Sequence, residues 1–341
     1  MANCPFCNTP PPAAYTSTER CELFACGACF NPYIIRRDGN STAGEIPENT
    51  QDIRLIAPEG SLGHAILSIL PQAFDKLPVM PEISMKILQM LRDPEMSMTD
   101  LATLIRQDPV VALTIMKLAN SPVYGGLQEI KDLNAACARL GSKTIANTVQ
   151  VVANSNLFIT GDKRLKNVMR ALWRHSVATA HCAFEVAKLL AEPRAESLFL
   201  GGLLHDIGKV VLLDIVTGSY SGAIASLRMT PELLDEVVQS FHPLVGLHLA
   251  QHWDLPPEFG AIAYAHHEPE RAPREDWLPL AHIVSMANAV AKVEGYGMRG
   301  KEDILLLSHP SARYLNFNDM KLATLRVDIS EKLEALLDAS G

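Results

Sequence analysis

The sequence predicts an all-α protein that is preceded by a small, separate cysteine-rich module. Apolar residues recur at helical spacing from about residue 63 to the end of the 341-residue chain, whereas the alternation typical of strands is rare. Five of the seven cysteines, by contrast, lie in the first 29 residues. These patterns divide the chain into a module at 1–35, a linker at 36–62 and a helical body at 63–341.

The module carries two CxxC pairs that are separated by 18 residues. Each pair can form a tight turn with both sulfurs on one side, and two such turns supply the four thiolates that Zn²⁺ prefers. A module this short buries too little apolar surface to fold by itself, so bound zinc would supply its folding energy. No βαβ pattern surrounds the pairs, which argues against a redox site. The predicted ligands of this zinc ribbon are Cys4, Cys7, Cys26 and Cys29, and Cys21 is a spare that could replace one of them.

The charge of the module bears on its partner. Residues 1–37 contain three basic and two acidic side chains, and zinc with four thiolates adds two negative charges. The net charge of the module is then close to −1, and that of the whole chain is −8. Neither charge favours binding to the phosphate backbone of a nucleic acid. We therefore expect the ribbon to dock a protein, and a zinc-ribbon nucleic-acid-binding regulator is the last-ranked alternative.

The linker is rich in Gly, Pro, Asn, Ser and Thr and shows no sustained apolar period. The helices that follow it begin and end at recognisable residues. Ser97 precedes an apolar-periodic stretch as an N-cap, Asp108-Pro109 opens the next helix, and Asn120-Ser121-Pro122 ends that helix. Further helices are predicted at 83–91, 134–140, 142–152, 167–190, 195–215, 231–253, 257–266, 278–293 and 318–339.

Histidines and one aspartate in the helical body form a second candidate site. His205 and Asp206 are adjacent at the end of an apolar helical run, so the pair could serve two metals, or one metal at a helix distortion. Imidazole and carboxylate ligands suit Mn²⁺, Fe or Zn²⁺, and such a metal polarises a phosphoryl oxygen. Lys209 is a candidate phosphate contact. The predicted ligands are His175, His205, Asp206, His242, His266 and His267. The alternative is a buried polar cluster that the core retains without metal.

In their order, these residues resemble the signature of the HD superfamily of metal-dependent phosphohydrolases. The preceding segment resembles the HDOD domain, the HD-related output domain of bacterial signalling proteins. Its marks are Leu77-Pro78 with Pro81, Asp108-Pro109, Asn120-Ser121, Leu140-Gly141 and the HDIGK stretch. The resemblance covers about residues 70–295. It implies an HDOD helical subdomain at about 63–160 that packs on an HD-type helical bundle at about 161–295, with C-terminal helices at about 300–341.

Two departures from the HD pattern shape the functional expectation. The resemblance implies an aspartate as the last metal ligand, where this chain has Asn288, and a neutral amide oxygen is a weaker ligand than a carboxylate. The GYP element of the cyclic-di-GMP phosphodiesterase branch is absent after His267-Glu268. One carboxylate leaves the site too positive to bind two dications tightly.

We therefore expect a non-enzymatic bacterial signal-transduction protein that binds a signalling partner or a nucleotide ligand. The alternative is a metal-dependent phosphohydrolase that acts on a cyclic dinucleotide or a nucleotide. The first residues have neither a basic nor an apolar leader region, and no run of about 18 apolar residues occurs. We expect a cytoplasmic protein without a membrane partner, in which thiols stay reduced.

Overall fold

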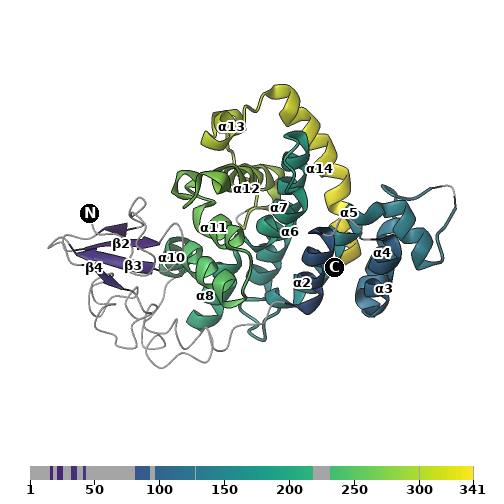
Figure 1. Ribbon diagram of the computed structural model, residues 1–341, viewed down its shortest axis with the longest axis horizontal. Helices are drawn as coiled ribbons and strands as arrows, with labels where there is room; N and C mark the ends of the chain where they lie inside the picture. The colour runs from purple at the N-terminus through teal and green to yellow at the C-terminus, as the bar shows by residue number, and fades with distance from the viewer. Residues whose placement is uncertain are drawn as a thin grey trace. The chain divides into compact units, whose positions relative to one another are not determined.

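The computed structural model describes residues 81–92, 97–126, 128–217, 231–298 and 300–340, together with four short strands near the N-terminus (Figure 1). The strands are β1 (Thr16–Ser17), β2 (Cys21–Ala25), β3 (Pro32–Arg36) and β4 (Ser41–Ala43), and they form an antiparallel sheet in that order. In its register Leu23 lies opposite Ile34. β4 falls within the segment expected to be a linker. The four predicted zinc ligands lie outside the described residues, so the zinc ribbon remains a prediction.

The regular elements of the described body are helices, apart from an isolated bridge between Gly297 and Gly300, and turns and loops connect them. This confirms the all-α prediction. The longer helices are α2 (Glu82–Arg92), α3 (Met98–Arg106), α4 (Pro109–Ala119), α5 (Leu133–Asn154), α6 (Lys166–Leu189), α7 (Ala195–Leu204), α8 (Ile207–Thr217), α10 (Pro231–His252), α11 (Pro257–Ala265), α12 (Leu278–Ala291), α13 (Pro310–Tyr314) and α14 (Asp319–Ser340). None of the described helices is long and apolar enough to cross a lipid bilayer.

Two of the helix starts follow directly from local sequence. The Ser97 hydroxyl accepts a hydrogen bond from the Asp100 N–H, and the Asp100 carboxylate accepts one from the Ser97 N–H, which completes a capping box. The Asp108 carboxylate accepts hydrogen bonds from the N–H groups of Val110 and Val111 in the first turn of α4. Pro109, the first residue of α4, has no N–H group that would need an acceptor. Both starts lie where the sequence predicted them.

Two other elements differ from the prediction. The helices expected at 134–140 and 142–152 are joined in α5. The chain kinks between them at Gly141, whose φ of 75° lies in the left-handed region that favours glycine. The single helix expected at 195–215 is instead two helices, because the chain turns at His205 and Asp206 between α7 and α8. Apolar residues continue through this turn, so periodicity could not reveal it. The turn is a helix distortion of the kind that the His-Asp pair suggested.

The helical body divides into two compact units. The helical part of the first unit covers 205–282, and the second unit covers 79–204 and 283–341. The boundary therefore falls at the turn between α7 and α8, and again within α12. In the second unit α6 packs along α7 and α14, and α4 packs on α5 (Figure 1). Its core includes fully buried Phe199, Leu172 and Ile115.

In the first unit α10 packs against both α8 and α11. The helices α8 and α10 approach so closely that a Cβ at position 208 would lie 2.1 Å from the His242 carbonyl oxygen. Only glycine therefore fits at position 208 in the first turn of α8, two residues after Asp206. This close approach brings the turn before α8 to the middle of α10, where His242 lies.

Candidate metal centre

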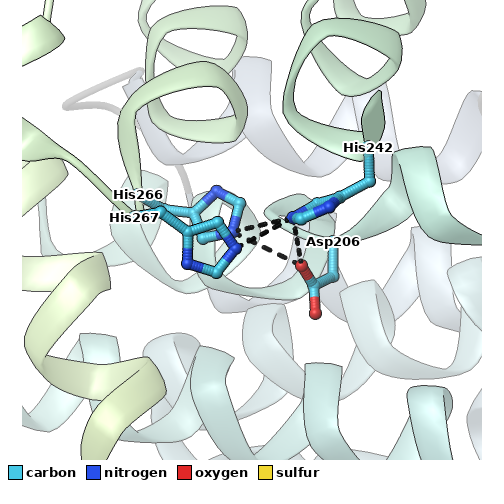
Figure 2. A group of neighbouring side chains, drawn as sticks. All are labelled: Asp206, His242, His266 and His267. Carbon is cyan, nitrogen blue, oxygen red and sulfur yellow. Dashed lines mark hydrogen bonds and ion pairs between the residues drawn. The ribbon is translucent and has the colours of Figure 1, made fainter. Parts of the chain in front are cut away.

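Four predicted ligands converge in the first unit, from three different elements (Figure 2). Asp206 lies in the turn before α8, His242 lies within α10 next to Pro243, and His266 and His267 follow the last residue of α11. One potential ligand atom from each of the four lies within 4.8 Å of the others. Asp206, His242 and His266 are buried, whereas His267 is exposed to solvent.

The distances within this cluster are short enough for one shared ion. The Asp206 Oδ1 atom lies 3.3 Å from His242 Nε2 and 3.4 Å from His266 Nε2. His242 Nε2 lies 3.4 Å from His266 Nε2 and 3.0 Å from His267 Nε2 (Figure 2). Three imidazoles and one carboxylate form a nitrogen-rich ligand set that suits first-row transition metals.

The backbone determines which ring nitrogens of His242 and His266 carry protons. The Nδ1 atom of His242 lies 2.8 Å from the Val238 carbonyl oxygen, and the Nδ1 atom of His266 lies 2.8 Å from the Ala263 carbonyl oxygen. A carbonyl oxygen can only accept, so each Nδ1 donates its proton. In each neutral ring the Nε2 atom then carries an unprotonated lone pair. The two Nε2 atoms face each other and the Asp206 carboxylate. Second-shell bonds of this kind commonly orient metal-binding histidines.

The ionisation states leave this cluster suited to a cation. Burial lowers the pKa of His242 well below its usual range, and burial lowers that of His266 to about 3. Both rings are therefore neutral near pH 7. Burial by itself would raise the pKa of Asp206, but His205 and Lys209 beside it hold that pKa well below its usual range. Converging lone pairs and an ionised carboxylate repel one another, and a bound metal ion would remove that repulsion.

Lys209, the candidate phosphate contact, pairs with Asp206, and its role towards phosphate remains a prediction. Its ammonium lies 2.7 Å from the Asp206 Oδ2 atom, one helical turn away, and the residue is 4% exposed. His205 Nε2 lies 3.4 Å from the same oxygen. The charge of Asp206 is therefore balanced by Lys209 on one side, while its Oδ1 faces the imidazoles.

His175 and Asn288 belong to the second unit, whereas the four converging ligands belong to the first. His175 is buried in α6, and its Nδ1 lies 3.2 Å from the Tyr296 carbonyl oxygen. Asn288 is buried in α12, and its Oδ1 has no hydrogen-bond partner among the described residues. A buried acceptor without a partner is uncommon and calls for an explanation.

An open hollow of about 480 Å³ adjoins the exposed His267. Gln239, Ser240 and Pro243 line it from α10, and Arg271 lines it from the segment after α11. None of these four residues was predicted from the sequence as part of a site. Helical spacing could have indicated part of this set, because Gln239 lies one turn before Pro243 and therefore on the same side of α10.

The described helices and the histidine-aspartate cluster together define an HD-type helical domain. The family model of the HDOD domain matches residues 77–269, which is more than half of the chain, and the chain belongs to this family. The match confirms the resemblance to the HDOD domain.

Individual relatives agree with this assignment. An uncharacterised protein of Treponema pallidum is 28% identical over 225 residues, which are 63% of this chain and 42% of that protein. The chain thus matches less than half the length of this relative. A crystal structure of an HDOD domain protein of unknown function from Geobacter sulfurreducens is 25% identical, with a TM-score of 0.63 over 80% of this chain and 98% of that chain.

A more distant structure shows the same fold. The crystal structure named "Putative metal-dependent phosphohydrolase", from Shewanella amazonensis, is 19% identical to this chain. Its TM-score is 0.56, over 81% of this chain and 98% of that chain.

Proposed function

We propose that this HDOD protein is a bacterial signal-transduction protein that binds one transition-metal ion at the Asp206 cluster and does not hydrolyse phosphoesters. In this proposal the helical body binds a signalling partner, and the zinc ribbon docks a second protein. The metal would be held by His242, His266, His267 and the Oδ1 atom of Asp206.

The charge of the cluster is the observation that supports this proposal. Asp206 is the one carboxylate in the four-residue cluster of described residues, and Lys209 balances its charge at 2.7 Å. One dication would already leave the site positive, because the imidazoles contribute no charge. A second dication at the spacing of about 4 Å used by two-metal hydrolases would be strongly repelled.

A single metal ion would still stabilise the fold. It would join the turn before α8, the middle of α10 and the end of α11, so binding would add to the free energy of unfolding by mass action. A metal of this kind supplies a Lewis acid and a bound water of lowered pKa, which is the chemistry that a hydrolase would use.

One observation favours the alternative of a metal-dependent phosphohydrolase. His267 is exposed, and the hollow beside it is open to solvent and has room for a phosphoester. The name of the Shewanella amazonensis structure points to the same chemistry in that protein. We rank this function second because of the single carboxylate.

Metal analysis of the full chain tests the metal site. Elemental analysis of the purified protein should find zinc together with a second equivalent of transition metal. The variant His242→Ala should lose the second equivalent and keep the zinc, whereas Cys4→Ser should lose the zinc and keep the second equivalent. The exposed His252→Ala variant, on the same helix α10, is the matched control and should lose neither. Equal metal content in His242→Ala and the unaltered protein would end the proposal of a metal at the cluster.

A phosphodiesterase assay tests the absence of hydrolysis. We expect no turnover of bis(p-nitrophenyl) phosphate or of cyclic di-GMP with added Mn²⁺ or Fe²⁺ above the level of the Asp206→Asn variant. Turnover that Asp206→Asn abolishes would instead establish the hydrolase.

A further inference from the structure

A second polar cavity lies within the second unit, and no residue of the metal cluster lines it. It has a volume of about 260 Å³ and is lined by residues of α4, α5, α6, α7 and α14. Pockets for drug-sized ligands usually measure about 300–1,000 Å³, so this one suits a smaller molecule. Its walls combine apolar side chains, including Phe184 and Phe199, with an unusual number of charged ones.

A buried carboxylate and two ammonium groups form one side of this cavity. The side chain of Glu185 in α6 is 5% exposed. Its Oε2 atom lies 2.7 Å from Lys188 Nζ, and its Oε1 atom lies 3.8 Å from Lys332 Nζ in α14. Both carboxylate oxygens therefore already face a lysine. A cationic ligand would have to compete with these lysines for the same two oxygens.

The lining of the cavity carries an excess of positive charge. Lys143 of α5 lines it together with Lys188 and Lys332, while Glu185 is the one acidic side chain among the lining residues. Lys143 and Lys332 also have carboxylate partners at 2.9 Å and 3.3 Å, but those partners are not part of the lining. An anion inside the cavity would therefore meet three ammonium groups and a single, already paired carboxylate.

The Nε2 atom of His181 is a further polar group on the wall of this cavity. The residue is 6% exposed and lines the cavity, and its Nε2 atom makes no hydrogen bond among the described residues. Buried polar atoms of native proteins are nearly always paired, with protein, water or ligand. A molecule in the cavity could pair with this nitrogen.

We propose that this cavity is a binding site for a small organic anion, with an aromatic or apolar body that packs on Phe184 and Phe199 and a carboxylate or phosphate group that contacts Lys188 and Lys332. His181 Nε2 would hydrogen-bond to a polar atom of the same molecule. Because Lys332 belongs to α14 and Lys188 belongs to α6, the ligand would strengthen the packing of these two helices. Such a ligand gives a signalling domain an input that is separate from its metal cluster.

Calorimetric titration of the full chain with three probes tests the site. Phenyl phosphate and benzoate share an aromatic ring with benzamide, which has no charge. We expect one of the two anions or both to bind with a Kd on the order of 1 mM or lower, and benzamide to bind at least about tenfold more weakly. The relative affinity of the two anions then shows whether the site prefers phosphate or carboxylate.

Lysine variants link that binding to this cavity. Lys332→Gln and Lys188→Gln should each weaken anion binding about tenfold or more, because each removes a charged hydrogen bond. Lys321→Gln is the matched control, since Lys321 lies in the same helix as Lys332 but does not line the cavity, and it should bind like the unaltered protein. A circular dichroism spectrum and melting curve of each variant confirms that it is folded.

Three results would overturn the proposal. They are the absence of heat from both anions, equal binding of benzamide and the anions, and full-strength binding in folded Lys332→Gln and Lys188→Gln proteins.

Discussion

Lowering the pH should destabilise the fold through His181. Burial lowers the pKa of this histidine to about 4 in the folded chain, against an ordinary value of 6.5. The unfolded chain therefore takes up a proton first as the pH falls, and the folded chain does not follow until about pH 4. The stability that the neutral ring contributes is complete above pH 6.5 and is lost between pH 6.5 and pH 4.

The magnitude follows from the two pKa values. Between pH 7.5 and pH 5 the difference in proton uptake amounts to about 2 kcal/mol of unfolding free energy for this one residue. The perturbation that isolates it is His181→Gln, which cannot titrate in this range. The loss of stability on acidification should be smaller in this variant by about the same 2 kcal/mol.

Urea unfolding followed by far-ultraviolet circular dichroism measures the effect at pH 7.5, 6.5, 5.5 and 5.0. The control is His252→Gln, because His252 is exposed and does not line the cavity that holds His181. Its pH dependence should match that of the unaltered protein. Parallel stability curves for His181→Gln and the unaltered protein would refute the reasoning, because the ring could not then be buried and neutral.

The remaining predictions concern backbone geometry. Gly208→Ala places a methyl group 2.1 Å from the His242 carbonyl oxygen, so it should cost about 1–3 kcal/mol or more of unfolding free energy and also lower metal occupancy, measured by urea unfolding and elemental analysis. Gly161→Ala, with open space around it, should stay within about 0.5 kcal/mol as the control. In Gly141→Ala the added methyl group also has open space, but the backbone φ of 75° is strained for alanine and should lower the free energy of unfolding by about 1–3 kcal/mol. An unchanged melting temperature would contradict this. Asp108→Ala should cost about 1 kcal/mol by removing the cap of α4, and the same loss in Asp108→Asn would show that charge rather than capping matters.

Most of the helices could be predicted because their signals are local. The apolar period of α6 and the caps at Ser97 and Asp108 each lie within a few residues of the feature that they specify. The turn between α7 and α8 could not be predicted in this way. The residues around it remain apolar, and the turn depends on Gly208 meeting the His242 carbonyl group in α10, which is more than 30 residues further along the chain.

The candidate site was predicted in its residue types and not in its arrangement. The order of His205, Asp206, His242, His266 and His267 could be read from the chain through its resemblance to a family. Which ring nitrogens carry protons, and which lysine neutralises Asp206, depends on backbone carbonyls and on helix packing. The predicted ligands Cys4, Cys7, Cys26 and Cys29 lie outside the described residues, so their arrangement remains a prediction.

The sequence by itself determined the helical class of the body, most helix limits and the identity of the histidines and the aspartate, because those depend on local periodicity, local caps and residue type. The tertiary structure decided which of these residues meet. It brought Asp206, His242 and His266 to within 3.4 Å of one another. It also placed His181, an ordinary helix residue in the sequence, beside a charged cavity, where its Nε2 atom makes no hydrogen bond among the described residues. The physical reason is that burial and convergence arise from contacts between helices that are far apart in the chain.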